Sequence, residues 1–96
     1  MAKRKKKSVE EWVEELEALA EEEKWVALLK AADRCVEEYP KHSAGYYGRG
    51  IAKSKLEYQE EAIADYDEAL ELETQDKKKA FIRNNRGNAL SDLKRY

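Results

Sequence analysis

Carboxylates supply most of the side chains in this 96-residue chain that could carry acid–base or metal chemistry. The chain has one histidine, His42, and one cysteine, Cys35, so it lacks the ligand set of a zinc site. Glu14–Glu15 and Glu21–Glu23 could form an acid–base pair, but nothing around them predicts the burial that would raise a carboxyl pKa. The sequence has no phosphate-binding loop, cofactor motif or nucleophile–base arrangement. We therefore predict a protein that is not an enzyme and that holds no cofactor or metal.

Charge divides the chain into a basic start and an acidic body. The formal net charge is −2, although the segment 3–7 alone supplies five basic residues. An acidic body repels nucleic acid, and no aromatic residue interrupts the basic run, so we expect no nucleic-acid partner. No apolar run follows the basic start and no segment is long enough to span a membrane, which predicts a cytoplasmic protein without membrane contact. We expect residues 1–7 to form a disordered basic tail and residues 8–96 to form a single domain.

The elements that must position any site are helices. Apolar residues recur at the 3.6-residue spacing of an α-helix over 9–22, 25–39, 44–56, 60–73 and 79–95. Ser8 and Glu11 fit a capping box before the first helix, Pro40 should end the second, and Ser43 is placed to cap the third. No segment alternates apolar and polar residues as a strand does. The predicted fold class is all-α, with five antiparallel helices.

A spacing of 34 positions groups these helices into repeats. Similar residues recur at this interval, with Trp12 returning as Tyr46, Leu28 as Ala62, Cys35 as Ala69 and Val36 as Leu70. Large apolar and small residues that recur in helical order at such a period are typical of stacked helix–turn–helix units. We predict repeat one over 9–42, repeat two over 43–76 and a terminal helix over 79–96.

The second repeat carries a recognisable pattern in Tyr46, Gly50, Ala62, Tyr66 and Ala69, which lie at fixed places along its two helices. This pattern resembles the tetratricopeptide (TPR) repeat, and it matches five of six positions of that family. The first repeat matches more loosely, because Leu16 stands where the family has a small residue. The resemblance implies a right-handed stack whose concave face is lined by the first helix of each repeat.

The same resemblance implies a peptide groove on that concave face. By position, the groove would contain Val13, Glu17, Tyr47, Ile51, Phe81, Asn84 and Asn88. Its apolar members would hold an extended peptide or a helix, and its asparagines would bond the peptide backbone. The alternative, that these residues are only inter-repeat packing and solvated surface, stays open and is the more common case. Glu17 would repel the C-terminal carboxylate that a subset of the family clamps, so we do not expect such a ligand.

Three functions stay open at this point. The first is a non-enzymatic helical-repeat scaffold, engineered to fold and without an evolved ligand, because the last helix is single, the repeats differ in quality and the surface is dense in Glu and Lys. The second is a natural TPR adaptor whose partner is a peptide or protein segment. The third is a self-associating unit, a monomer or weak homodimer that pairs through Leu90 and Leu93 or through Trp25.

Overall fold

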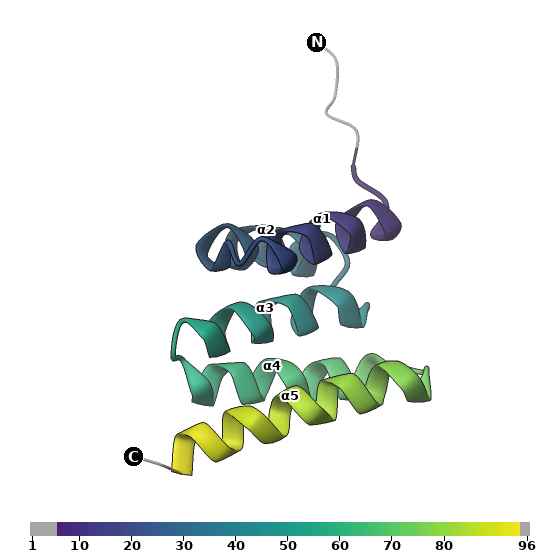
Figure 1. The fold of residues 1–96 in the computed structure, drawn as a ribbon. Helices are drawn as coiled ribbons and strands as arrows, with labels where there is room; N and C mark the ends of the chain where they lie inside the picture. The colour runs from purple at the N-terminus through teal and green to yellow at the C-terminus, as the bar shows by residue number, and fades with distance from the viewer. Residues whose placement is uncertain (1–5, 95–96) are drawn as a thin grey trace.

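The computed structural model describes residues 6–94, which form five helices stacked one layer upon the next (Figure 1). The helices are α1 (Val9–Glu21), α2 (Trp25–Glu38), α3 (Ser43–Lys55), α4 (Gln59–Leu72) and α5 (Asp76–Lys94). Each helix packs against the next along the chain, and α3 also contacts α1 and α5. No strand occurs among residues 6–94. The predicted all-α class is confirmed, and α1, α3 and α5 follow one another along one side of the stack.

The helix boundaries repeat at the interval found in the sequence. Helices α1 and α3 each span 13 residues and helices α2 and α4 each span 14, and the members of each couple begin 34 positions apart. The turns repeat as well. Glu23 and Glu57, with φ of 57° and 71°, take the same left-handed conformation, and their amides donate to the carbonyl oxygens of Ala20 and Ser54. The sequence period is therefore also a structural period.

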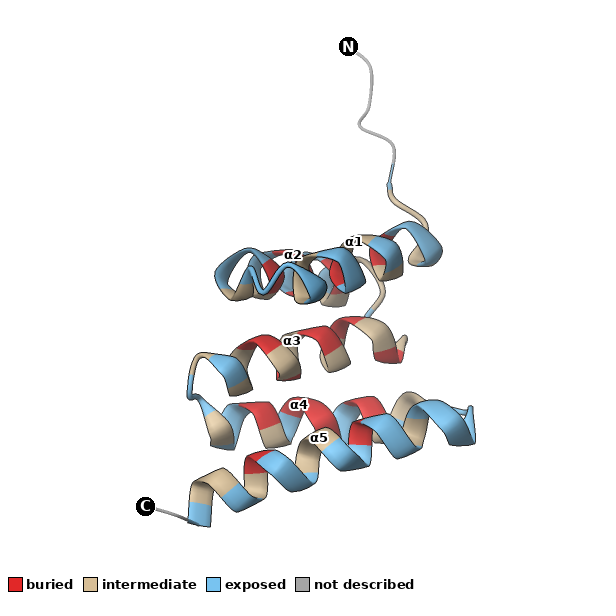
Figure 2. Ribbon diagram, in the orientation of Figure 1, coloured by how far each residue is buried: buried red, intermediate tan, exposed pale blue. Residues whose placement is uncertain are grey.

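The core divides into two clusters, one centred on α1 and α2 and one on α4 and α5. Figure 2 shows buried residues on all five helices. The first cluster is made of Trp12, Leu16, Leu28, Ala31, Ala32, Cys35 and Ala52, and the second of Ala62, Tyr66, Ala69, Ile82 and Ala89. Because Ile82 and Ala89 come from α5, this last helix closes the second cluster.

Residue sizes at the centre of the two helix pairs are reversed. The first pair has Leu16 on α1 and Ala32 on α2, whereas the second has Gly50 on α3 and Tyr66 on α4. A Cβ atom at Gly50 would lie 2.7 Å from the Tyr66 ring, so the ring occupies the space that a side chain at residue 50 would need. The departure of Leu16 from the TPR pattern is thus accompanied by a small residue on the facing helix.

The start of α3 differs from the prediction. The residue that caps it is His42, whose Nδ1 accepts a hydrogen bond from the Ala44 amide at 3.1 Å. Ser43 is the first helical residue, and its hydroxyl donates instead to the Glu73 carboxylate at 2.5 Å. The predicted Ser43 cap is therefore wrong, because a residue distant in sequence attracts that hydroxyl.

Two residues of the predicted tail contact the side chains of the first helix pair. The Lys6 ammonium lies 4.4 Å from the centroid of the Tyr39 ring, and the Lys7 ammonium lies 4.3 Å from a Trp12 ring centroid and pairs with Glu15. These contacts place Lys6 and Lys7 against α1 and α2. The predicted disorder of residues 1–5, and the predicted helical end at 95–96, lie outside the described residues.

Candidate functional site

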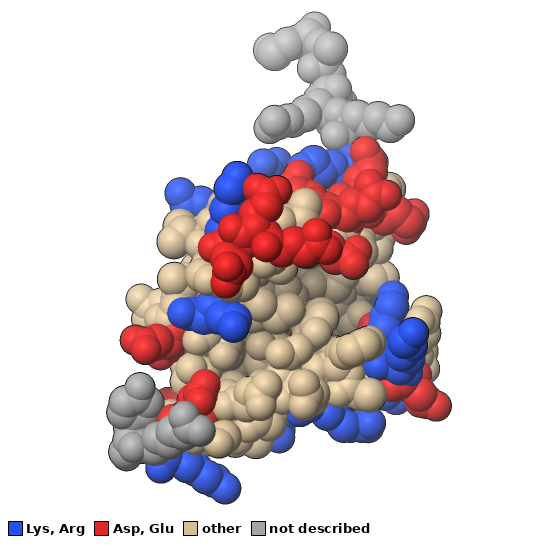
Figure 3. Space-filling view, viewed as in Figure 1, with Lys and Arg blue, Asp and Glu red and all other residues tan. Residues whose placement is uncertain are grey.

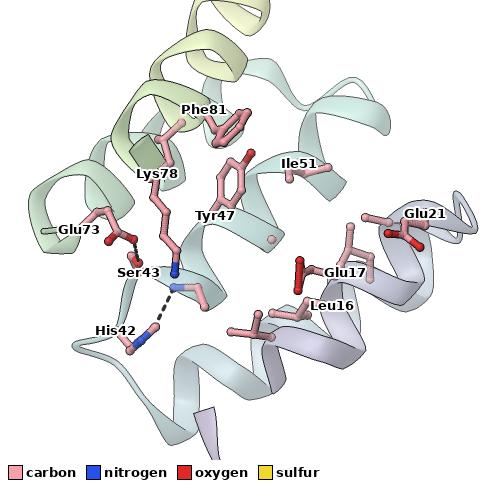
Figure 4. A pocket seen from close by; sticks show the side chains of 16 residues that line it. Leu16, Glu17, Glu21, His42, Ser43, Tyr47, Ile51, Glu73, Lys78 and Phe81 are labelled. Carbon is pink, nitrogen blue, oxygen red and sulfur yellow. Dashed lines mark hydrogen bonds between the residues drawn. The ribbon is translucent and has the colours of Figure 1, made fainter. Parts of the chain in front are cut away.

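Helices α1, α3 and α5 enclose a groove of about 460 Å³ on one side of the stack. Figure 3 shows a hollowed, uncharged area in the middle of the molecule, with acidic side chains gathered over the end formed by α1 and α2. The residues that line the groove are Val13, Leu16, Glu17, Ala20, Glu21, Leu28, His42, Ser43, Ala44, Tyr47, Gly48, Ile51, Glu73, Lys78, Phe81 and Ile82 (Figure 4). The first helices of the repeats and the terminal helix supply most of them.

The structure brings five of the seven predicted groove residues together. Val13, Glu17, Tyr47, Ile51 and Phe81 line the groove. Asn84 and Asn88 do not, and both are exposed on α5. Residue 88 lies about two turns, roughly 10 Å, farther along α5 than Phe81. Asn84 lies one turn from Phe81, but its exposed side chain is not part of the lining.

Apolar side chains form the floor of the groove. Val13, Tyr47 and Ile51 are half-buried, and Phe81 keeps 54% of its surface exposed at the rim. The Tyr47 ring lies 6.2 Å from the buried Tyr66 ring, which holds it in place. The floor is therefore preformed on α1 and α3, and α5 adds an aromatic side chain that solvent can reach.

Asn85, which was not predicted as part of the site, orients the Tyr47 hydroxyl. Its side-chain amide donates to the Tyr47 oxygen at 2.8 Å and to the Phe81 carbonyl at 3.1 Å. Burial raises the pKa of Tyr47, and the hydrogen bond from Asn85 offsets only part of that rise. The hydroxyl thus stays protonated near neutral pH and keeps a proton to donate. Asn85 follows Phe81 by four residues, a spacing that places both on one helix face.

One end of the groove is polar and is held by the chain itself. The Glu73 carboxylate accepts hydrogen bonds from the Ser43 hydroxyl and from the amides of Thr74 and Gln75, the last two at 3.1 Å. Burial alone would raise the pKa of Glu73, but these hydrogen bonds and the nearby Lys78 ammonium outweigh it and hold the pKa below its usual range. Glu73 therefore ties the loop before α5 to the start of α3.

The α1 side of the groove is acidic. Glu17 and Glu21 lie one turn apart on α1, and neither forms an ion pair with a described residue. The last turn of α1 contains no basic residue, whereas the last turn of α3 contains Lys53 and Lys55. Glu21, which the TPR resemblance also places on the concave face, and Lys78, which was not predicted, are further charged lining residues. Lys78 lies three residues before Phe81, and this helical spacing was the signal available for it.

A second charged cluster lies away from the groove and holds helices together. Asp65, 6% exposed on α4, accepts hydrogen bonds from Arg49 Nε and Nη2 at 3.0 and 2.9 Å. Arg49 also reaches Asp33 of α2 at 3.3 Å, and Lys53 lies 3.4 Å from Asp65. The hydrogen bond to Asp65 raises the pKa of Arg49. The cluster joins α2, α3 and α4, and we assign it a structural role.

Cys35 and the carboxylates are the remaining side chains that the sequence offered for chemistry. Cys35 is buried, and this burial, with the charge of Glu38, raises the pKa of its thiol to about 11. Between residues 6 and 94, no three His, Cys, Asp or Glu side chains are grouped so that they could hold a metal ion. Over the same stretch, no helix is long and apolar enough to cross a membrane.

Comparison of the chain with protein-family models, with curated proteins and with solved structures finds no match. The resemblance to the TPR family is therefore carried by the chain's own residues.

Proposed function

We propose that the chain is a non-enzymatic, TPR-like helical-repeat module that binds a short peptide segment in the groove between α1, α3 and α5. The observation that carries this proposal is the groove itself, with its apolar floor and a volume of about 460 Å³. Ligand sites in proteins span roughly 300–1,000 Å³ and combine apolar walls with a few polar groups. The Tyr47 hydroxyl and the flanking charged side chains supply those polar groups here.

The exposure of Phe81 supports a role in binding rather than in folding. A buried Phe removes about 150–250 Å² from water, so covering the 54% that remains exposed would contribute roughly 2–3 kcal/mol before the costs of association. Exposed apolar surface grouped in a groove marks interaction sites more often than isolated exposed residues do. Phe81 is therefore the residue that we expect to anchor a bound segment.

The form of the groove suits a peptide better than a compact small molecule. It runs from α1 across α3 to α5, and charged side chains, Glu17 and Glu21 on α1 and Lys78 on α5, lie on the two outer helices. Amphipathic helices bind in such grooves through side chains spaced three and four residues apart, and extended peptides bind through alternate side chains. A segment of either kind could place an apolar side chain against Tyr47 and Phe81.

Phe81→Ala, compared with Tyr58→Ala, tests the proposal. Tyr58 is 55% exposed and lies outside the groove, so it matches Phe81 in size and exposure. Peptides would first be selected with the unmodified protein from a displayed random library, and their affinities would then be measured by fluorescence anisotropy. We expect Phe81→Ala to weaken binding roughly tenfold or more, as loss of an aromatic anchor does, and Tyr58→Ala to leave it unchanged. A library without binders, or binders indifferent to Phe81→Ala, would contradict the proposal.

The hypothesis of an engineered scaffold without a ligand stays a prediction, and the same selection separates it from peptide binding. A protein made only to fold should enrich no peptide through this groove. Peptides that lose affinity on Phe81→Ala would count against it.

Self-association is a second candidate, which one observation favours. A Cβ atom at Gly87 would meet nothing within 4 Å, so the outer face of α5 is uncovered by the described chain. The sequence-based version of this hypothesis named Leu90, Leu93 and Trp25, but all three are half-buried. A sedimentation equilibrium mass equal to that of one chain at every protein concentration would exclude it.

A further inference from the structure

We infer that the segment bound in the groove is basic and amphipathic, with one or two Lys or Arg residues that contact Glu17 and Glu21. The inference rests on the proposed function, because it specifies the charge of the peptide that the groove would bind. It follows from the two α1 carboxylates, from the helix that carries them and from the other charges that line the groove.

Glu17 and Glu21 face the groove as a pair of carboxylates without a cation. Figure 4 shows both side chains on the α1 side of the groove, across from Tyr47 and Phe81. No described Lys or Arg forms an ion pair with either of them. Lys55 lies one repeat on from Glu21, but its ammonium is over the Trp25 ring, 5.4 Å from the centroid. A ligand cation would therefore meet two carboxylates that are not already engaged.

These two carboxylates do not help α1 to fold. Like charges four residues apart on a helix repel each other. Glu21 is also the last residue of α1, where the negative end of the helix dipole disfavours an acidic side chain. A bound cation at this place would be attracted by both carboxylates and by the end of the helix. The repulsion that destabilises α1 in the free protein is relieved when a basic residue binds, and this relief strengthens binding.

The second repeat shows that the helical packing does not require acidic residues here. The positions of Glu17 and Glu21 are taken in α3 by Ile51 and Lys55. Helix α3 has the same length and the same terminal turn as α1, so neither position needs a carboxylate for that architecture. The acidic pair is thus a property of the α1 side of the groove and not of the repeat.

The remaining charges favour a basic partner over an acidic one. The lining residues include three carboxylates, those of Glu17, Glu21 and Glu73, and a single ammonium, that of Lys78. Glu73 is already hydrogen-bonded by the loop and by Ser43, and the Lys78 charge acts on it. An acidic segment would find one cation at the α5 end and repulsion along α1, whereas a basic segment gains along α1.

The test selects peptides of roughly 12 residues, about three helical turns, with the unmodified protein and with Glu17→Gln/Glu21→Gln. The matched control is Glu10→Gln/Glu14→Gln, which removes two exposed carboxylates at the same spacing from the same helix but outside the groove. We expect the unmodified protein to enrich peptides with Lys or Arg beside apolar residues. The groove variant should bind them roughly tenfold more weakly, since two exposed ion pairs together are worth about a factor of two to thirty. The control variant should stay within about twofold.

Salt and stability give two further readouts. Binding to the unmodified protein should weaken as sodium chloride is raised, and the groove variant should lose most of that dependence. The same variant should unfold at an equal or higher denaturant concentration than the unmodified protein, since it has lost a repulsion. A variant that binds less well while folding at least as well would show that the carboxylates serve the partner.

Each adverse outcome points to a different failure. Enriched peptides that are neutral or acidic, or that bind the groove variant undiminished, would overturn the inference and leave peptide binding intact if Phe81→Ala still weakens them. A library that yields no binder would overturn the proposed function as well. A dimer in sedimentation that is broken by Phe81→Ala would show that a second copy of the chain, and not a basic peptide, occupies the groove.

Discussion

Gly50→Ala and Gly87→Ala are the same chemical change in two helices, and the structure predicts opposite effects on stability. The two glycines lie 37 positions apart, at the interval that also relates buried Gly45 and Ala52 of α3 to buried Ile82 and Ala89 of α5. They are therefore equivalent positions of successive first helices. A Cβ at Gly50 would lie 2.7 and 2.8 Å from ring atoms of Tyr66, whereas a Cβ at Gly87 would meet nothing within 4 Å.

The magnitudes follow from two opposing contributions. Replacing a glycine inside a helix by alanine stabilises the helix by about 1 kcal/mol, and this gain applies to both positions. At Gly50 the new methyl group must displace the Tyr66 ring, which is 1% exposed and packed in the second core cluster. Inserting a methyl group into such a core costs about 1–3 kcal/mol. We expect Gly87→Ala to stabilise by about 1 kcal/mol and Gly50→Ala to destabilise by up to about 2 kcal/mol.

Chemical denaturation followed by far-ultraviolet circular dichroism measures both effects on one scale. In thermal unfolding of the same samples, a change of 1 kcal/mol in the free energy of unfolding corresponds to about 4–8 °C in melting temperature for a domain of this size. The two variants should therefore be well separated. The slope of the free energy against denaturant should stay constant in both. Two stabilised variants would show that the Tyr66 ring moves freely. Two destabilised variants would show that the face of α5 around Gly87 is covered, which would refute the reasoning.

The other predictions concern the core, the loop before α5 and the thiol. Tyr66→Ala should cost roughly 3–5 kcal/mol, as large aromatic truncations in cores do, and a near-neutral denaturant melt would contradict the repeat register. Because the pKa of Glu73 is lowered in the folded state, its contribution to stability is complete above the unfolded-state pKa and is lost as the pH falls through the folded-state pKa. Glu73→Gln should therefore lose less stability than the unmodified protein when melts are compared across the acid pH range. Because burial raises the pKa of Cys35 to about 11, a thiol reagent at neutral pH should label it only as fast as the protein opens, and rapid labelling of the native state would contradict its burial.

The sequence period predicted most of what positions the groove. Large and small residues that recur every 34 positions specify which face of each helix is buried, and those faces define the stack. The floor residues Val13, Tyr47 and Ile51 were implied by the resemblance to the TPR family, in which the first helix of each repeat lines the concave face, and they do line the groove. Their place in the repeat was enough to predict them, because α1 and α3 have the same length and end in the same turn.

Residues whose roles depend on long-range contacts could not be predicted in this way. The local sequence around Ser43 predicts a helix cap, but the Ser43 hydroxyl donates to Glu73, which is 30 positions away. Asn84 and Asn88 were placed in the groove by analogy with position, whereas Asn85 makes the contact with Tyr47. The packing of α5 is set mainly by α4, with which it has many more contacts than with α3. A sequence pattern read one residue at a time contains none of these relations.

The repeat provides an internal comparison that separates packing from binding. Where the two repeats differ and the facing helix differs in compensation, as with Leu16 opposite Ala32 and Gly50 opposite Tyr66, packing accounts for the difference. Where the two repeats differ and no facing residue compensates, packing does not explain the difference. Glu17 and Glu21 are of this second kind, because their carboxylates repel each other and neither forms an ion pair with a described Lys or Arg. A marginally stable domain retains such a destabilising pair most readily when a bound partner offsets the repulsion. Binding should therefore be tested first at these two positions.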